Sequence, residues 1–120
     1  MHFNKNEITI YFNSENPTSN KLIAYALSNH KKVNKQDVTS LDVSANILGS
    51  MLVNYNGNIK DLLNKGLPFY QENLKGRAFS IREWSSIIKK NPTLLYNPLV
   101  HFNGKTICCV GPEDIFKLLS

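Results

Sequence analysis

The chain contains very little cysteine. Only two cysteines occur among its 120 residues, and they are neighbours, Cys108 and Cys109. Two adjacent cysteines cannot build a disulfide framework, so a small disulfide-stabilised secreted domain is excluded and a reducing compartment is favoured. Their neighbours in residues 107–110 are apolar, and consecutive strand residues point to opposite faces of a sheet. We therefore predict that both cysteines are structural, with a redox or metal-binding role as the alternative.

Long apolar runs are also lacking. No run approaches the roughly 18–20 apolar residues that a membrane-spanning helix needs. Residues 1–6 (Met-His-Phe-Asn-Lys-Asn) contain no apolar segment of the kind found in signal peptides. These absences predict a cytoplasmic protein without a membrane partner.

Acidic residues are fewer than basic ones, 9 against 14, which gives a formal net charge of +5. The basic residues are spread along the chain, and the densest groups are only the pairs Lys31-Lys32 and Lys89-Lys90 near expected helix ends. Cations are favoured there by the helix dipole. A nucleic-acid site would need a basic stripe or patch with interleaved aromatic residues. The sequence therefore predicts no direct nucleic-acid partner.

Familiar catalytic and metal-binding patterns are missing as well. There is no glycine-rich phosphate loop and no paired-carboxylate signature. The three histidines, His2, His30 and His101, have no metal-ligand spacing with one another or with the cysteines. No His–Asp pair is placed to activate a hydroxyl nucleophile. We expect neither a metal nor a cofactor.

The first 40 residues follow a strand–helix–strand pattern. Residues 7–12 alternate and are β-branched, as in a strand. Asn16 then has the character of a helix N-cap, with Pro17 at the first helical position and an apolar stripe over residues 22–27. Residues 33–39 can form a second, polar edge strand. A crossover helix makes such strands parallel.

A helical insertion is predicted over about residues 40–96. Short helices are expected at residues 44–53, 59–64 and 69–74, and a capping box of Ser80 and Glu83 starts another helix.

Two strands at residues 98–102 and 106–110 then flank Asn103-Gly104, a strong hairpin signal. Pro112 opens a final helix with an apolar face of Ile115, Phe116, Leu118 and Leu119. The fold class is therefore α/β, with a four-stranded mixed sheet in the order β-α-β, inserted helices, β-β-α.

This order resembles the arsenate reductase/Spx family of thioredoxin-fold proteins over nearly the whole chain. The resemblance rests on several residues in register: Tyr11 ending the first strand, Lys21 in the first helix, Asn91-Pro92, Asn97-Pro98, Asn103-Gly104-Lys105 and Gly111-Pro112-Glu113-Asp114. It implies a single thioredoxin-like domain, residues 1–120.

The resemblance also implies that the catalytic site is degenerate. Asn16 falls where the family has its catalytic cysteine, and Ser19 falls where the Spx branch has a second cysteine. Asn20 falls where an arginine is usual, whereas Lys21 keeps the following lysine. Arsenate reduction needs a thiolate nucleophile, and an amide cannot replace it.

The expected oxyanion-binding arginines are missing too, because Asn97 stands at one of their positions and residues 110–111 contain none. Pro98 corresponds to the family's cis-proline, so we predict a cis Asn97–Pro98 bond. A binding groove is then expected around Asn13, Asn16, Pro17, Asn97 and Pro98.

Three functions follow from this resemblance. The first is a non-catalytic binding or regulatory protein that recognises another protein. The second is an active glutaredoxin-dependent arsenate or thiol-disulfide reductase that uses Cys108 or Cys109. The third is an Spx-like transcription regulator that binds RNA polymerase. The partner expected is a protein, either RNA polymerase or a thiol enzyme.

Overall fold

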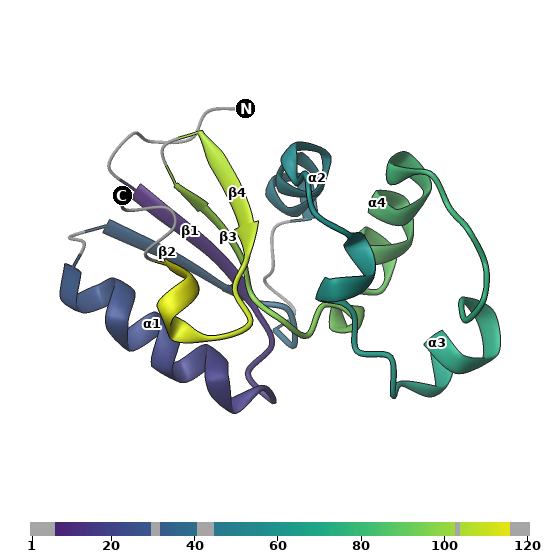
Figure 1. The fold of residues 1–120 in the computed structure, drawn as a ribbon, viewed down its shortest axis with the longest axis horizontal. Helices are drawn as coiled ribbons and strands as arrows, with labels where there is room; N and C mark the ends of the chain where they lie inside the picture. Colours follow the sequence, from purple (N-terminus) through teal and green to yellow (C-terminus); the bar gives the residue numbers. More distant parts are fainter. Residues whose placement is uncertain (1–6, 30–31, 41–44, 103, 116–120) are drawn as a thin grey trace.

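A mixed four-stranded sheet lies at the centre of the computed structural model, which describes residues 7–29, 32–40, 45–102 and 104–115 (Figure 1). The strand order is β2-β1-β3-β4. The strands are β1 (Glu7–Phe12), β2 (Lys32–Asp37), β3 (Leu99–Phe102) and β4 (Lys105–Cys108). β1 is parallel to β2 and antiparallel to β3, and β3 is antiparallel to β4. The predicted fold class is confirmed.

Helix α1 (Pro17–Asn29) makes the crossover between the parallel strands, and it begins at the predicted proline. β2 lies at the sheet edge as expected, but it ends at Asp37 and not at Thr39. The carboxylate of Asp37 accepts hydrogen bonds from the backbone N–H groups of Thr39 (3.0 Å) and Ser14 (3.3 Å). These bonds turn the chain out of the strand two residues early.

A block of short helices separates β2 from β3. It comprises α2 (Ala45–Asn54), the 3-10 helix η1 (Ile59–Leu62), α3 (Pro68–Asn73), α4 (Ile81–Lys90) and the 3-10 helix η2 (Pro92–Leu94). The predicted capping box is present: Ser80 Oγ accepts from the N–H of Glu83, and the Glu83 carboxylate accepts from the N–H of Ser80. None of the described helices combines the length and apolar character needed to cross a membrane.

The C-terminal part contains the predicted hairpin. Phe102 and Lys105 pair across the turn, and Gly104 has a φ of +79°, a conformation that glycine adopts readily. A short 3-10 helix, η3 (Pro112–Ile115), begins at the predicted proline. The rest of the expected final helix, including Phe116, Leu118 and Leu119, lies outside the described residues.

The sheet separates two apolar clusters. On one face, Ile10 and Val100 pack against α1 through residues that include Leu22. On the other face, Tyr11 and Leu99 pack against the helical block. Alternate strand residues reach opposite clusters because strand side chains have a period of two. η3 lies beside α1 (Figure 1), so these two elements lie on the same face of the sheet.

Candidate functional site

The turn between β1 and α1 is organised by Asn16. Its backbone N–H donates to the carbonyl of Asn13 (2.9 Å), and its side-chain Oδ1 accepts from the N–H of Thr18 (3.1 Å). The second bond is the predicted N-cap of α1, which satisfies one of the free N–H groups of the first helical turn. Asn16 therefore occupies the helix N-terminus where a thiolate would gain most stabilisation.

The same side chain also joins the turn to the segment before β3. Asn16 Nδ2 donates to the carbonyl of Tyr96 (3.1 Å) and to Oδ1 of Asn97 (3.4 Å). Asn13 Nδ2 donates to the carbonyl of Leu95 (3.1 Å). The structure thus brings together the asparagines predicted to meet here, although they are far apart in the chain.

This contact is packed tightly. Asn13 and Asn16 are only 2% and 4% exposed, and Pro98 is buried. Pro17, in contrast, is exposed on the outer side of the turn. The predicted groove residues therefore form a closed contact with an accessible rim.

The predicted cis peptide bond is absent. No peptide bond of the described residues is cis, so Asn97–Pro98 is trans and that prediction is wrong. Hydrogen bonds hold the chain on both sides of this bond: the N–H of Asn97 donates to the carbonyl of Leu62 (3.2 Å), and the carbonyl of Pro98 accepts from the N–H of Cys109 (2.9 Å). The trans form is intrinsically favoured by about 0.5–1 kcal/mol before proline. Both of these hydrogen bonds are formed with the trans peptide bond in place.

The other residues predicted to belong to the degenerate site differ in burial. Ser19 is fully buried, and its hydroxyl is the one buried side-chain polar atom of the described residues without a hydrogen-bond partner. Asn20 and Lys21 are exposed. Only Asn16 and Ser19 therefore lie inside the site, and Lys21 belongs to the accessible rim.

The unpartnered hydroxyl of Ser19 leads to a prediction about stability. Replacing Ser19 by alanine is expected to raise the free energy of unfolding by about 1 kcal/mol, since burying a hydroxyl without a partner is unfavourable and alanine is the better helix former. Urea denaturation measures the change. The matched control is Ser80→Ala, which removes the capping box and should lower the free energy of unfolding by about 1 kcal/mol. If both variants lost the same free energy of unfolding, the description of the Ser19 hydroxyl as buried without a hydrogen-bond partner would be contradicted.

The two cysteines lie on opposite faces of the sheet, as predicted. Cys109 is 1% exposed in the cluster beside α1, whereas Cys108 packs at the edge of the cluster beside the helical block. Burial, with smaller contributions from the carboxylates of Asp61 and Asp114, raises the pKa of the Cys108 thiol to about 11. Cys108 therefore lacks the low pKa that makes a thiol a good nucleophile at neutral pH, and Cys109 is shielded by burial.

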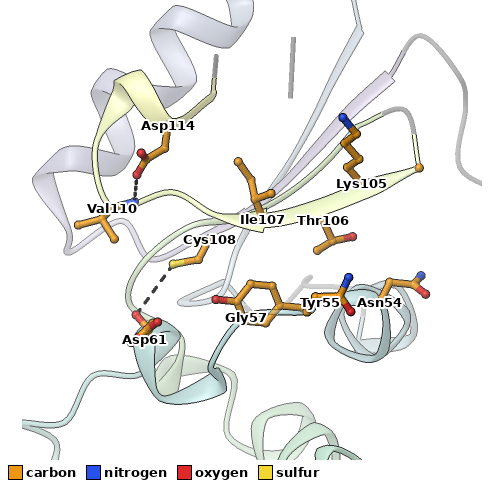
Figure 2. Close-up of a pocket in the computed structure, with 12 residues that line it drawn as sticks. Asn54, Tyr55, Gly57, Asp61, Lys105, Thr106, Ile107, Cys108, Val110 and Asp114 are labelled. Atoms are coloured by element: carbon orange, nitrogen blue, oxygen red, sulfur yellow. Dashed lines mark hydrogen bonds between the residues drawn. The ribbon is translucent and has the colours of Figure 1, made fainter. Parts of the chain in front are cut away.

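Asp61 is the residue of this region that the sequence pattern did not indicate. Its backbone carbonyl accepts from Asn97 Nδ2 (2.7 Å) and lies 3.9 Å from the sulfur of Cys108, which donates to it (Figure 2). Asp61 thereby links the Asn16–Asn97 contact to β4. Nothing in the sequence signals this, because the link depends on how the helical block packs on the sheet.

Metal binding finds no support in the part of the chain that the structure describes. No three His, Cys, Asp or Glu side chains of those residues are grouped closely enough to hold an ion. His101 is buried and its Nδ1 lies 2.7 Å from Thr106 Oγ1. Burial lowers the pKa of His101, as expected for a neutral side chain packed within the protein.

Comparison with known proteins identifies the fold. No protein-family model and no curated protein matches the sequence. The solved structures include an arsenate reductase from Vibrio cholerae with a TM-score of 0.75 and 19% identity, in an alignment covering 96% of this chain and 99% of that one.

Two further solved structures are similar. One is described as a possible arsenate reductase, from Streptococcus mutans, with a TM-score of 0.68, 20% identity, and coverage of 91% and 97%. The other is an arsenate reductase-related protein from Brucella melitensis, with a TM-score of 0.60, 14% identity, and coverage of 99% and 99%. This chain therefore has the thioredoxin-like fold of the arsenate reductase-related proteins.

Proposed function

We propose that this protein is a member of the arsenate reductase/Spx-like group that has lost catalysis and acts by binding another protein. The observation that carries the proposal is the position of Asn16. Its carboxamide caps α1 and bonds to Tyr96 and Asn97, and the resemblance to the family assigns this position to the nucleophile. A carboxamide cannot take part in thiol-disulfide exchange.

The reductase alternative is less well supported. It requires Cys108 or Cys109 as the nucleophile, but the pKa of Cys108 is about 11 and Cys109 is buried. Thiolates, and not thiols, attack disulfides. The arrangement of the two cysteines favours a structural role.

The binding surface that we assign lies on the rim of the Asn16 turn. Pro17, Asn20 and Lys21 are exposed there, and the half-buried Asn97 contacts Asn16. This rim presents one positive charge and several hydrogen-bonding groups around a rigid helix N-terminus. Such a surface suits a protein partner with a complementary acidic group.

The test is capture of the natural partner from the cell that makes the protein. Wild-type protein and two charge-reversal variants are compared by quantitative mass spectrometry: Lys21→Glu on the rim, and Lys75→Glu, an exposed lysine after α3, as the matched control. We expect one protein to be lost with Lys21→Glu and kept with Lys75→Glu. RNA polymerase as that protein would favour a transcription regulator, and a thiol enzyme would favour a modulator of redox chemistry. Retention of every partner by Lys21→Glu would contradict the proposed surface.

A further inference from the structure

A second surface lies along β4, at the edge of the sheet. β4 is the last strand in the order β2-β1-β3-β4, so no strand of the described residues pairs with its outer edge. Leu99 pairs with Cys108, so Pro98 lies opposite Cys109 in the same register. The N–H of Cys109 donates to the carbonyl of Pro98, which makes this pair a hydrogen-bonded one. Hydrogen-bonded pairs alternate along antiparallel strands. Ile107 therefore directs its backbone groups toward β3, and Thr106 and Cys108 direct theirs outward.

A cavity of about 600 Å³ runs beside this edge (Figure 2). Its floor is β4 from Lys105 to Cys108, and its other wall is the end of α2 with the loop that follows, including Tyr55 and Gly57. The glycine is required, because a Cβ atom at position 57 would collide with the phenol ring of Tyr55. The phenol ring of Tyr55 occupies this space, and its hydroxyl donates to the carbonyl of Asn58 (3.4 Å).

The charges of this cavity are unevenly distributed. Asp61 and Asp114 line it near Cys108, and Lys105 lies toward the hairpin. Both carboxylates act on the thiol of Cys108, and Asp61 also acts on the hydroxyl of Tyr55. Both residues line the same cavity, in which Asp114 Oδ2 also accepts from the backbone N–H groups of Val110 (2.9 Å) and Gly111 (3.2 Å) (Figure 2). An acidic pocket is notable in a chain whose net charge is +5.

We propose that this cavity binds an extended, basic segment of a partner protein, which adds to the sheet as a strand beside β4. The backbone groups of Thr106 and Cys108 would hydrogen-bond to the segment, and a lysine or arginine side chain of the segment would pass Tyr55 to reach Asp61 and Asp114. Strand addition gives affinity through main-chain hydrogen bonds, and side-chain pockets beside the edge give specificity. This site goes beyond the proposed rim at Asn16 and does not depend on it.

The probe is a displayed library of random peptides of about nine residues, long enough for one strand and its flanks. Selection on wild-type protein should enrich peptides with alternating β-branched residues and a lysine or arginine at one position. The affinity of one selected peptide is then measured by fluorescence anisotropy. Asp61→Asn should weaken its binding by about ten-fold, as expected for a charge-assisted hydrogen bond, and it leaves the backbone carbonyl of Asp61 in place for Asn97.

Two controls make the result specific. Glu72→Gln removes an exposed carboxylate on α3, away from the cavity, and should leave the affinity unchanged. N-methylation of alternate peptide amides should weaken binding by about ten-fold or more in only one of the two registers, because only one set faces β4. Amide shifts of the labelled protein should be largest at residues 105–108.

Three results would overturn the inference. One is selection of peptides without a basic preference, or no selection at all. Another is shifts that centre on the Asn16 turn, which would leave the proposed rim standing and remove the β4 site. The third is concentration-dependent dimerisation, measured by sedimentation, that competes with the peptide, which would assign the edge to a second copy of the chain.

Discussion

Replacing Asn16 by alanine is expected to lower the free energy of unfolding by about 2–4 kcal/mol. Loss of the N-cap to Thr18 accounts for about 1 kcal/mol. The remainder comes from the partly buried carbonyl of Tyr96, which loses the Asn16 donor, at a typical cost of about 1–3 kcal/mol. Urea denaturation of the purified variant measures the change.

Two companion variants separate these contributions. Asn20→Ala changes an exposed asparagine of the same helix and should shift the free energy of unfolding by no more than about 0.5 kcal/mol. Asn16→Asp keeps the cap but cannot donate to Tyr96 when ionised, so its stability should approach that of the wild type as acid protonates the carboxyl group. If Asn16→Ala were as stable as Asn20→Ala, the hydrogen bonds of the Asn16 side chain would contribute nothing to the free energy of unfolding.

Replacing Asn16 by cysteine should create a thiol far more acidic than the natural Cys108. The N–H of Thr18 and the N-terminus of α1 favour a thiolate at position 16. Its pKa should therefore fall below the ordinary value of about 8.5, whereas the pKa of Cys108 is raised to about 11. At neutral pH the thiolate fractions should differ by more than about 100-fold, which ultraviolet titration and iodoacetamide labelling can measure.

Cys108→Ser in the same background assigns the labelled residue. Reductase activity should not return with Asn16→Cys alone, because Asn20 and Asn97 offer no cation for an oxyanion. Adding Asn97→Arg should lower the pKa of the new thiol further. A pKa at or above 8.5 would show that the carbonyl of Tyr96 and Oδ1 of Asn97 outweigh the helix N-terminus.

Local chemistry explains which parts of the fold could be predicted. The hairpin at Gly104, the capping box at Ser80 and the start of α1 at Pro17 all depend on neighbouring residues, and all three are present. The opposite placement of Cys108 and Cys109 follows from the period of a strand. The predicted end of β2 lies two residues too far along the chain, because the side chain of Asp37 accepts a hydrogen bond from Ser14, which is distant in the sequence.

The site was harder to predict because its contacts cross the whole chain. Asn16 was expected to cap α1, and it does, but its second role as a donor to Tyr96 depends on where η1 and η2 place that segment. The same packing brings the carbonyl of Asp61 to the side chain of Asn97. The peptide bond that follows, before Pro98, is trans. None of these contacts has a short-range signal in the sequence.

Arsenate turnover is the most direct test of the central claim that this protein binds without catalysing. Wild-type protein is assayed with arsenate, using glutathione with glutaredoxin as one electron donor and thioredoxin as the other. We predict no turnover with either donor, since the turn around Asn16 contains no thiol. Turnover that disappears with Cys108→Ser or Cys109→Ser would contradict the claim and would make that cysteine the nucleophile.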